Sequence, residues 1–250
     1  MKTTLQVSAI LLGCLVTMIG AGARSQTDRE RVHLILSNLP PHGSPAYQAL
    51  KKRAGKATGQ VLPLTKSEMW SVPKESVEAV RKAAAAHWLD VQELGRDWNH
   101  LFHPAPADIK LNTQQSVMID QVLAAKATQG IRLMVAAAPS TVEYALTAEA
   151  ASKRSVSSII LALSGAKALT ITRRSVDLRS DMCVWRGSVQ GTDSPATIMW
   201  WPQGKMTGSV RHEGRLYSIR HLGGEVHAII EMSEERMPDD HPPAPQMQKR

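Results

Sequence analysis

Two neighbouring stretches decide the fold: CVWRGSVQG at residues 183–191 and ATIMWWPQGKMTGSVRHEGRLYSIRHLGGEVHAIIEM at residues 196–232. Five runs within them have strand length and are apolar or alternating, namely residues 184–189, 196–201, 206–211, 216–220 and 226–232. The segments between these runs are short and contain Gly, which supplies the positive φ angles that tight hairpin turns need. This pattern predicts an up-and-down antiparallel β-meander.

Several short motifs recur along the meander and just beyond it. They are Trp185-Arg186-Gly187, Gly208-Ser209-Val210-Arg211, GRLYSIR at 214–220, Leu222-Gly223-Gly224 and PDDHPP at 238–243. In this order they resemble the β-rich prodomain that precedes the catalytic domain in bacterial secreted zinc metalloproteases of the reprolysin (adamalysin-like) type. The resemblance extends back to about residue 107. It implies a non-catalytic region whose partner is a zinc metalloprotease catalytic domain, and the HExxH motif of such a domain is absent from these 250 residues.

The N-terminus predicts export. Lys2 supplies a positive charge, residues 5–19 are mostly apolar, and Ala21-Gly22-Ala23 matches an A-x-A cleavage site, so residues 1–23 are a predicted secretory signal peptide. A lipoprotein cleavage at Cys14 is the competing interpretation, but the apolar run continues past that cysteine. The run is too short for a membrane anchor, and we expect a secreted or periplasmic protein with no transmembrane segment after signal removal.

Composition limits the partners and the source of stability. The formal net charge is +8, but the basic residues are scattered and no basic stripe carries interleaved aromatic residues, so we expect no nucleic-acid partner. A basic exported protein is compatible with an acidic polysaccharide partner. Removal of the signal peptide would leave Cys183 as the only cysteine, which excludes an intramolecular disulfide and leaves stability to packing.

The N-terminal part predicts an alternation of strands and helices. A strand is expected at 32–36, a helix at 46–54 capped by Ser44, two strands at 60–64 and 69–72, a helix opened by Pro73 with its apolar face reaching Trp88, and a strand at 89–94. The order strand, helix, strand, strand, helix, strand is that of a ferredoxin-like unit.

The middle of the chain predicts a second domain. Asn112 is a candidate cap for a helix with Val117, Met118, Val122 and Ala125 on its apolar face. Residues 132–137 predict a strand, residues 143–150 fit either strand or helix, and further strands are expected at 156–163, 168–173 and 176–178. The expected class is therefore α+β: a ferredoxin-like domain at 24–104, a β-rich prodomain-like domain with the meander at 107–237, and a flexible Pro-rich tail at 238–250.

No set of residues predicts a metal or catalytic site. His212-Glu213 begins like HExxH, but residue 216 is Leu and the segment lies in a Gly-flanked turn, whereas the motif needs two imidazoles one helical turn apart. His100 and His103 could share a helical face, and a pair of loop or core histidines is the favoured alternative. Because no G-x-S-x-G, Cys-His pair or phosphate-binding Gly loop occurs either, we expect no catalytic, cofactor-binding or metal residues and no enzyme activity.

Two features could act on a partner protease. In animal and venom enzymes related to the resembled family a prodomain cysteine caps the catalytic zinc, and Met182-Cys183-Val184 has a superficial similarity to that segment, although a strand position predicts a buried Cys183. Asp239-Asp240-His241 could offer a carboxylate to a partner's zinc, since carboxylates are competent zinc ligands. A solvated linker is the alternative for this acidic segment.

Two functional hypotheses follow. The first is a non-catalytic secreted prodomain-like protein that inhibits or assists the folding of a zinc metalloprotease, or is the remnant of one. The second is a periplasmic or cell-surface binding module for polysaccharide or another envelope component. Trp200-Trp201 motivates the second, because successive residues on a strand point to opposite faces and one indole could be exposed for stacking.

Overall fold

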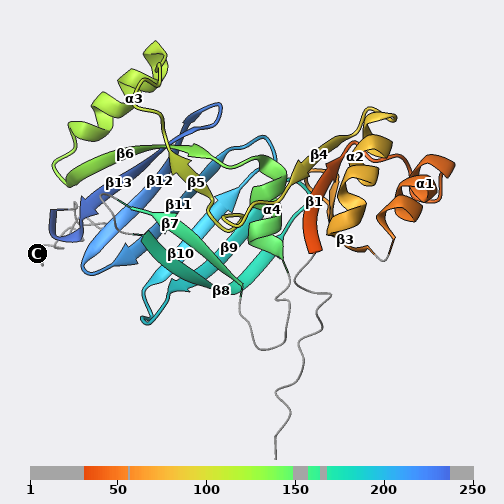
Figure 1. Ribbon diagram of the computed structural model, residues 1–250. Helices are drawn as coiled ribbons and strands as arrows, with labels where there is room; N and C mark the ends of the chain where they lie inside the picture. Colours follow the sequence, from red (N-terminus) through yellow and green to blue (C-terminus); the bar gives the residue numbers. More distant parts are fainter. Residues whose placement is uncertain (1–30, 56, 149–156, 164–167, 237–250) are drawn as a thin grey trace, which may run out of the picture.

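The protein is described here from a computed structural model, which defines residues 31–55, 57–148, 157–163 and 168–236 (Figure 1). The predicted signal peptide with Cys14, the leader at 24–30 and the tail with Asp239, Asp240 and His241 lie outside these described residues. No helix within the described ranges is long and apolar enough to cross a membrane. The fold is mostly antiparallel β, arranged as two sheets.

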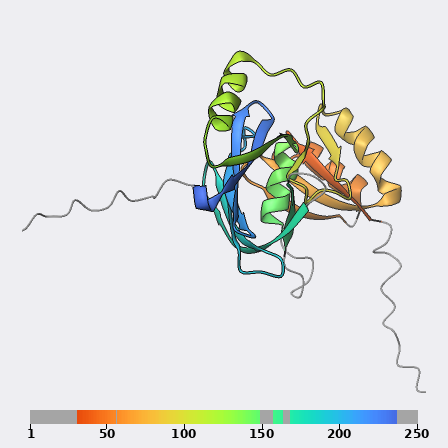
Figure 2. The ribbon, with the colours of Figure 1, turned by 90° about the vertical axis from the view of Figure 1, so that its left-hand side faces the viewer.

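The first sheet has four antiparallel strands in the order β2-β3-β1-β4. Its elements along the chain are β1 (Arg31–Ser37), α1 (Pro45–Ala54), β2 (Thr58–Leu62), β3 (Ser67–Pro73), the short 3-10 helix η2 (Lys74–Ser76), α2 (Val77–Ala85) and β4 (Asp90–Glu93). Figure 2 shows that α1 and α2 lie on the face of this sheet that points away from the second sheet. The buried core of this unit therefore lies between two helices and one sheet face, and includes Leu34, Leu36, Leu50, Trp70 and Val80.

The ends of α1 follow from local chemistry. The Ser44 side chain accepts a hydrogen bond from the Tyr47 amide at 3.2 Å, and Pro45 occupies the first turn, where its missing N–H costs nothing. Gly55 ends the helix with φ +63°, a value that favours glycine. The predicted cap and end of this helix are confirmed.

The predicted face of α2 is wrong at Trp88. The helix ends at Ala85, and Trp88 lies beyond it with φ +57° and 93% of its surface exposed. Apolar spacing continues through Trp88 in the sequence, but no glycine or other stop signal marks the true end. The backbone turns there so that β4 can return beside β1.

The second sheet has nine strands in the order β5-β6-β13-β12-β11-β10-β9-β8-β7. Their bounds are β5 (Phe102–Pro104), β6 (Thr128–Ala136), β7 (Ser158–Ala162), β8 (Ala168–Leu178), β9 (Cys183–Val189), β10 (Pro195–Trp200), β11 (Met206–His212), β12 (Arg215–Gly223) and β13 (Val226–Ser233), followed by the 3-10 helix η3 (Glu234–Arg236). The predicted meander is thus present as β9 to β13. The sheet curls until its two ends meet, where His100 forms a bridge with Ile160 and the Ile160 amide donates to the Asn99 carbonyl at 2.9 Å.

The interior of this nearly closed barrel holds large side chains that need local clearance. Trp185 and Trp200 are fully buried within it. A Cβ atom at Gly187 would lie 2.5 Å from the Trp185 ring, and one at Gly208 would lie 2.3 Å from the Thr197 carbonyl oxygen on the adjacent strand. Glycine is therefore needed at both positions to accommodate the indole ring and the neighbouring backbone.

Two helices complete the barrel. α3 (Thr113–Leu123) has the predicted cap, Asn112, and covers the outer face of β13. The Asn112 side chain accepts a hydrogen bond from the Gln115 amide, and the Gln115 side chain accepts one from the Asn112 amide. The predicted apolar face of α3 is confirmed at Met118 and Val122, which pack against the sheet. The prediction is wrong at Val117, which is 48% exposed, and at Ala125, which is exposed and lies beyond the end of the helix. Residues 143–147 of the ambiguous segment belong to a helix, α4 (Pro139–Thr147).

Candidate functional site

The junction between the two sheets is built around α4, which lies between the barrel and the four-stranded sheet (Figures 1 and 2). One side of this helix, including Val142 and Leu146, packs into the barrel core. On the other side, Tyr144 and Trp98 contact each other with ring centroids 5.1 Å apart, and both pack against a small apolar cluster from the four-stranded sheet. Burial of this apolar surface connects the two units.

Glu143 of α4 adds a polar link to the same junction. Its side chain is fully buried and accepts hydrogen bonds from the Leu64 amide at 2.9 Å, the Thr65 amide at 2.8 Å and the Thr65 hydroxyl at 2.6 Å. These donors lie in the turn between β2 and β3. A buried carboxylate is tolerable only when it is hydrogen-bonded in this way, so Glu143 holds that turn against α4.

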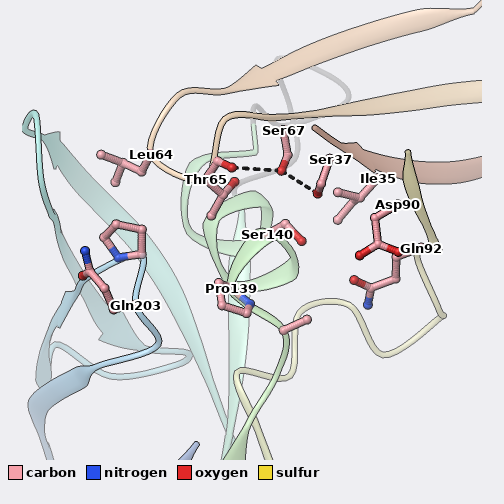
Figure 3. Close-up of a pocket in the computed structure, with 12 residues that line it drawn as sticks. Ile35, Ser37, Leu64, Thr65, Ser67, Asp90, Gln92, Pro139, Ser140 and Gln203 are labelled. Carbon is pink, nitrogen blue, oxygen red and sulfur yellow. Dashed lines mark hydrogen bonds between the residues drawn. The ribbon is translucent and has the colours of Figure 1, made fainter. Parts of the chain in front are cut away.

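A cavity of about 480 Å³ opens beside this link (Figure 3). It is lined mainly by hydroxyl, amide and carboxylate side chains together with the start of α4 and a loop of the barrel: Ile35, Ser37, Leu64, Thr65, Ser67, Asp90, Gln92, Ala138, Pro139, Ser140, Pro202 and Gln203. The Ser37 and Ser67 hydroxyls form a hydrogen bond (Figure 3) with their oxygens 2.9 Å apart, and the Ser67 hydroxyl also donates to the Thr65 carbonyl. The hydroxyl, amide and carboxylate groups of this lining can hydrogen-bond to a polar ligand group.

A second cavity of about 380 Å³ shares Gln92 and Ala138 with the first. The Gln92 side chain donates to the Thr141 hydroxyl at 3.2 Å and stands between the two. His103 and Trp98 line the second cavity. The cavities therefore lie along the face of the four-stranded sheet that looks toward the barrel.

A polar cluster lies on the opposite face of the four-stranded sheet. The carboxylate of Glu68 is buried and accepts hydrogen bonds from the Tyr47 hydroxyl at 3.1 Å and the Trp70 indole at 2.7 Å, and it also contacts His42. Desolvation, followed by the neighbouring Glu68 charge, raises the pKa of Tyr47 to about 12. Lys51 lies 4.8 Å from the Trp70 ring centroid, a cation–π distance. The Glu68, Tyr47 and Trp70 groups are hydrogen-bonded to one another, which makes them structural, while Lys51 stays partly exposed.

His227 is fully buried in the barrel and lies beside a second histidine, His221. His227 Nδ1 lies 2.9 Å from the Glu225 carbonyl, and Nε2 accepts from the Met206 amide at 3.2 Å, which places the ring proton on Nδ1. Burial lowers the pKa of His227 to about 4. His221 on β12 lies beside it with ring centroids 4.9 Å apart. Within the described ranges no group of three or more His, Cys, Asp or Glu side chains could hold a metal ion.

The residues that the sequence singled out do not assemble into one site. His212 ends β11 and Glu213 lies in the next turn with φ +52°, so the predicted turn is confirmed and the segment is not helical. His103 lies on β5 and His100 in a bridge to β7, so these two histidines do not share a helical face.

Cys183 and Trp200 are core residues of the barrel. The Cys183 thiol is fully buried, and desolvation, then the charges of Glu143 and Asp177, raise its pKa to about 12. A thiol in this setting stays protonated and cannot reach a partner's zinc. Trp200 is fully buried, while Trp201 is half-buried with the Lys205 amine 4.8 Å from its ring centroid.

Sequence reasoning missed the buried carboxylates Glu68 and Glu143 beside the four-stranded sheet. Neither belongs to a motif, and the partners of Glu143 lie 78 and 79 residues away in the chain. One sequence signal could have drawn attention to Glu68: it is the first acidic residue after Glu30, at the end of a stretch whose charged residues are all basic.

Comparison with known proteins relates a short part of the chain to a metalloprotease. Two proteins from Stenotrophomonas maltophilia, both called peptidyl-Asp metalloendopeptidase, match it. The strain R551-3 protein is 43% identical over 54 residues, which is 21% of this chain and 13% of the relative. The strain K279a protein is 51% identical over 37 residues, which is 15% of this chain and 9% of the relative. The chain thus spans a small fraction of the relatives it matches, and no family model or solved structure matches it.

Proposed function

We propose that this chain is a non-catalytic, exported, prodomain-like protein that binds a zinc metalloprotease and inhibits it or assists its folding. The observation that carries the proposal is the local identity to the two peptidyl-Asp metalloendopeptidases. The HExxH motif is absent from the sequence, so the proposal assigns the chain to the partner-binding side of such a system.

We infer further that residues 31–93 form a ferredoxin-like unit. Support comes from the strand order β2-β3-β1-β4, the antiparallel pairings and the position of two helices on one face. In this proposal the small unit and the barrel form one body joined at α4, and that body covers the protease cleft. Fold analogy contributes nothing to the choice of partner.

The acidic segment of the tail provides the proposed contact with the cleft. Asp239 and Asp240 follow Pro238, and a carboxylate can replace water at a zinc ion. The relatives' name refers to peptidyl-Asp bonds, and an acidic segment is compatible with such a cleft. A polysaccharide-binding role is not favoured, because Trp200 is buried and Trp201 is partly covered by Lys205.

The test is an inhibition assay with the S. maltophilia peptidyl-Asp metalloendopeptidase as the probe protease. The full chain should inhibit peptide cleavage, and removal of residues 238–250 should weaken inhibition by about tenfold or more. A double variant with Asp239→Asn and Asp240→Asn separates the carboxylates from the rest of the tail. Equal inhibition by the full and shortened chains would refute the role of the tail, and no inhibition or binding by the full chain would refute the proposal.

A further inference from the structure

The N-terminal part of the chain has a pronounced charge bias. Between residues 31 and 67 every charged residue is basic: Arg31, Lys51, Lys52, Arg53, Lys56 and Lys66. The next acidic residue, Glu68, is buried under Tyr47 and Trp70. The exposed charges contributed by this stretch are therefore positive.

The two end strands of the four-stranded sheet differ in how they are protected. β4 is four residues long and carries two acidic residues, Asp90 and Glu93. β2 (Thr58–Leu62) has no charged residue, and its Val61 side chain is 58% exposed. Natural edge strands are usually blunted by charge, shortness or proline, because the unpaired backbone groups of an edge invite another strand. Among the described strands of this sheet, β2 is the edge strand without a charged residue, and its Gln60 side chain donates to the Thr147 hydroxyl of α4 at 3.4 Å.

The fold gathers the positive charge next to β2. Gly59 of β2 is paired with Trp70, and the Lys51 amine lies over the Trp70 ring. Lys52 belongs to the exposed part of the last turn of α1, shortly before β2, and Lys66 is exposed in the turn that follows β2. The two acids nearest to this strand, Glu68 and Glu143, are buried and already accept hydrogen bonds.

We propose that β2 is a docking edge to which an extended acidic segment of the partner protease adds as a fifth strand. Backbone hydrogen bonds to β2 would provide affinity, and the basic side chains of Lys51, Lys52 and Lys66 would select acidic residues on the added strand. The identity of the partner rests on the proposed function. The location of the contact and its charge are new.

The experiment measures the affinity of the full chain for the inactivated S. maltophilia peptidyl-Asp metalloendopeptidase. Val61→Asp places a like charge opposite the acidic strand and should lower the affinity about tenfold or more, whereas Val61→Lys should lower it by less than about threefold. Val117→Asp is the matched control, because Val117 is an exposed valine on α3, and it should leave the affinity unchanged. Thermal unfolding of each variant establishes that it is folded.

A second variant guards against a folding defect at β2. Lys52→Glu combined with Arg53→Glu alters only exposed side chains of α1 and should also lower the affinity, with a smaller salt dependence than that of the unaltered chain.

The possible results separate this inference from the proposed function. If neither Val61→Asp nor the α1 double variant weakens binding, the docking edge is overturned and the proposed function still stands. Equal losses for Val61→Asp and Val61→Lys would overturn the acidic preference. A dimer of this chain that Val61→Asp abolishes would assign the edge to a second copy instead. Absence of any binding by the unaltered chain would overturn both proposals.

Discussion

The two sheets of this protein differ in what they do with their edges. In the nine-stranded sheet the two ends meet where His100, which lies just before β5, bridges Ile160 of β7, so this sheet nearly closes into a barrel. In the four-stranded sheet β2 and β4 each have one neighbouring strand. Closure removes edges, whereas an open sheet keeps them available for strand addition. In our proposal the barrel is therefore the scaffold and the small sheet is the docking element.

The interiors of the two regions also differ. The barrel is filled by apolar side chains around Trp185 and Trp200, with glycines providing clearance. The four-stranded sheet instead has a buried carboxylate associated with each of its faces, Glu68 on one side and Glu143 of α4 on the other. The predictions below test this contrast between steric packing and polar linkage.

The largest effect is expected in the barrel. Gly208→Ala would place a methyl group 2.3 Å from the Thr197 carbonyl oxygen, so the free energy of unfolding should fall by roughly 3 kcal/mol or more. Gly130→Ala in β6 is the matched control, since a Cβ there meets nothing within 4 Å, and its effect should stay within about 0.5 kcal/mol. Urea denaturation measures both values, and similar stabilities would contradict the close packing of the barrel strands.

The hydrogen bonds of Glu143 on α4 should contribute nearly as much to the free energy of unfolding. Glu143→Ala leaves the Leu64 and Thr65 amides without their acceptor and should lower the free energy of unfolding by about 3 kcal/mol. Thr65→Val removes one of the three hydrogen bonds to the same carboxylate and should cost about 1 kcal/mol. Chemical denaturation compares the two variants, and an equally small loss for both would mean that Glu143 does not hold the turn.

A smaller, pH-dependent effect is expected from His227. Because its pKa of about 4 in the folded barrel lies below the ordinary 6.5, protonation favours the unfolded chain. This contribution to stability is complete above pH 6.5 and is lost as the pH falls toward 4, by about 2 kcal/mol at pH 5. His227→Gln should flatten the fall measured in urea titrations from pH 7 to pH 5.

The four-stranded sheet supplies the comparison for that experiment. Burial and the charge of Arg31 lower the pKa of His33, so His33→Gln should also reduce the pH dependence. In a variant that carries both His33→Gln and His227→Gln, the free energy of unfolding should fall less between pH 7 and pH 5. An undiminished fall would show that other groups control the acid sensitivity.

The smallest effect is expected at Cys183, whose thiol should not react with an alkylating reagent in the folded protein. Its pKa of about 12 and complete burial keep the thiol protonated, so an alkylating reagent at pH 8 should leave it unmodified in the folded protein and modify it in denaturant. Replacement of Cys14 by Ser leaves a single thiol to report. Rapid alkylation of the folded chain would reopen a zinc-capping role for this cysteine.

The meander could be predicted because its signals are local. Turn residues such as Gly191, Gly204 and Gly214 have positive φ angles, and they separate runs of strand length. Ser44 and Asn112 marked two helix starts for the same reason. Closure of the barrel depends instead on pairing between segments far apart in the chain, and the three residues of β5 are too few to show any periodicity.

The site could not be predicted because its partners are distant in the sequence. Glu143 lies in a segment whose pattern fits both strand and helix, and its donors belong to a turn near residue 65. The docking edge that we propose at β2 depends on the position of this strand at the end of a sheet and on its proximity to Lys51, and neither can be read from the sequence. Charge bias is visible in the sequence, but the strand beside which it gathers is not.

Hydrogen exchange of the full chain, alone and with the inactivated S. maltophilia protease, tests the division between scaffold and docking element most directly. The account predicts slower exchange of amides in β2 (Thr58–Leu62) on addition of the protease, with the amides of β9 to β12 unchanged. Protection confined to the outer strands of the barrel, with β2 unaffected, would contradict it.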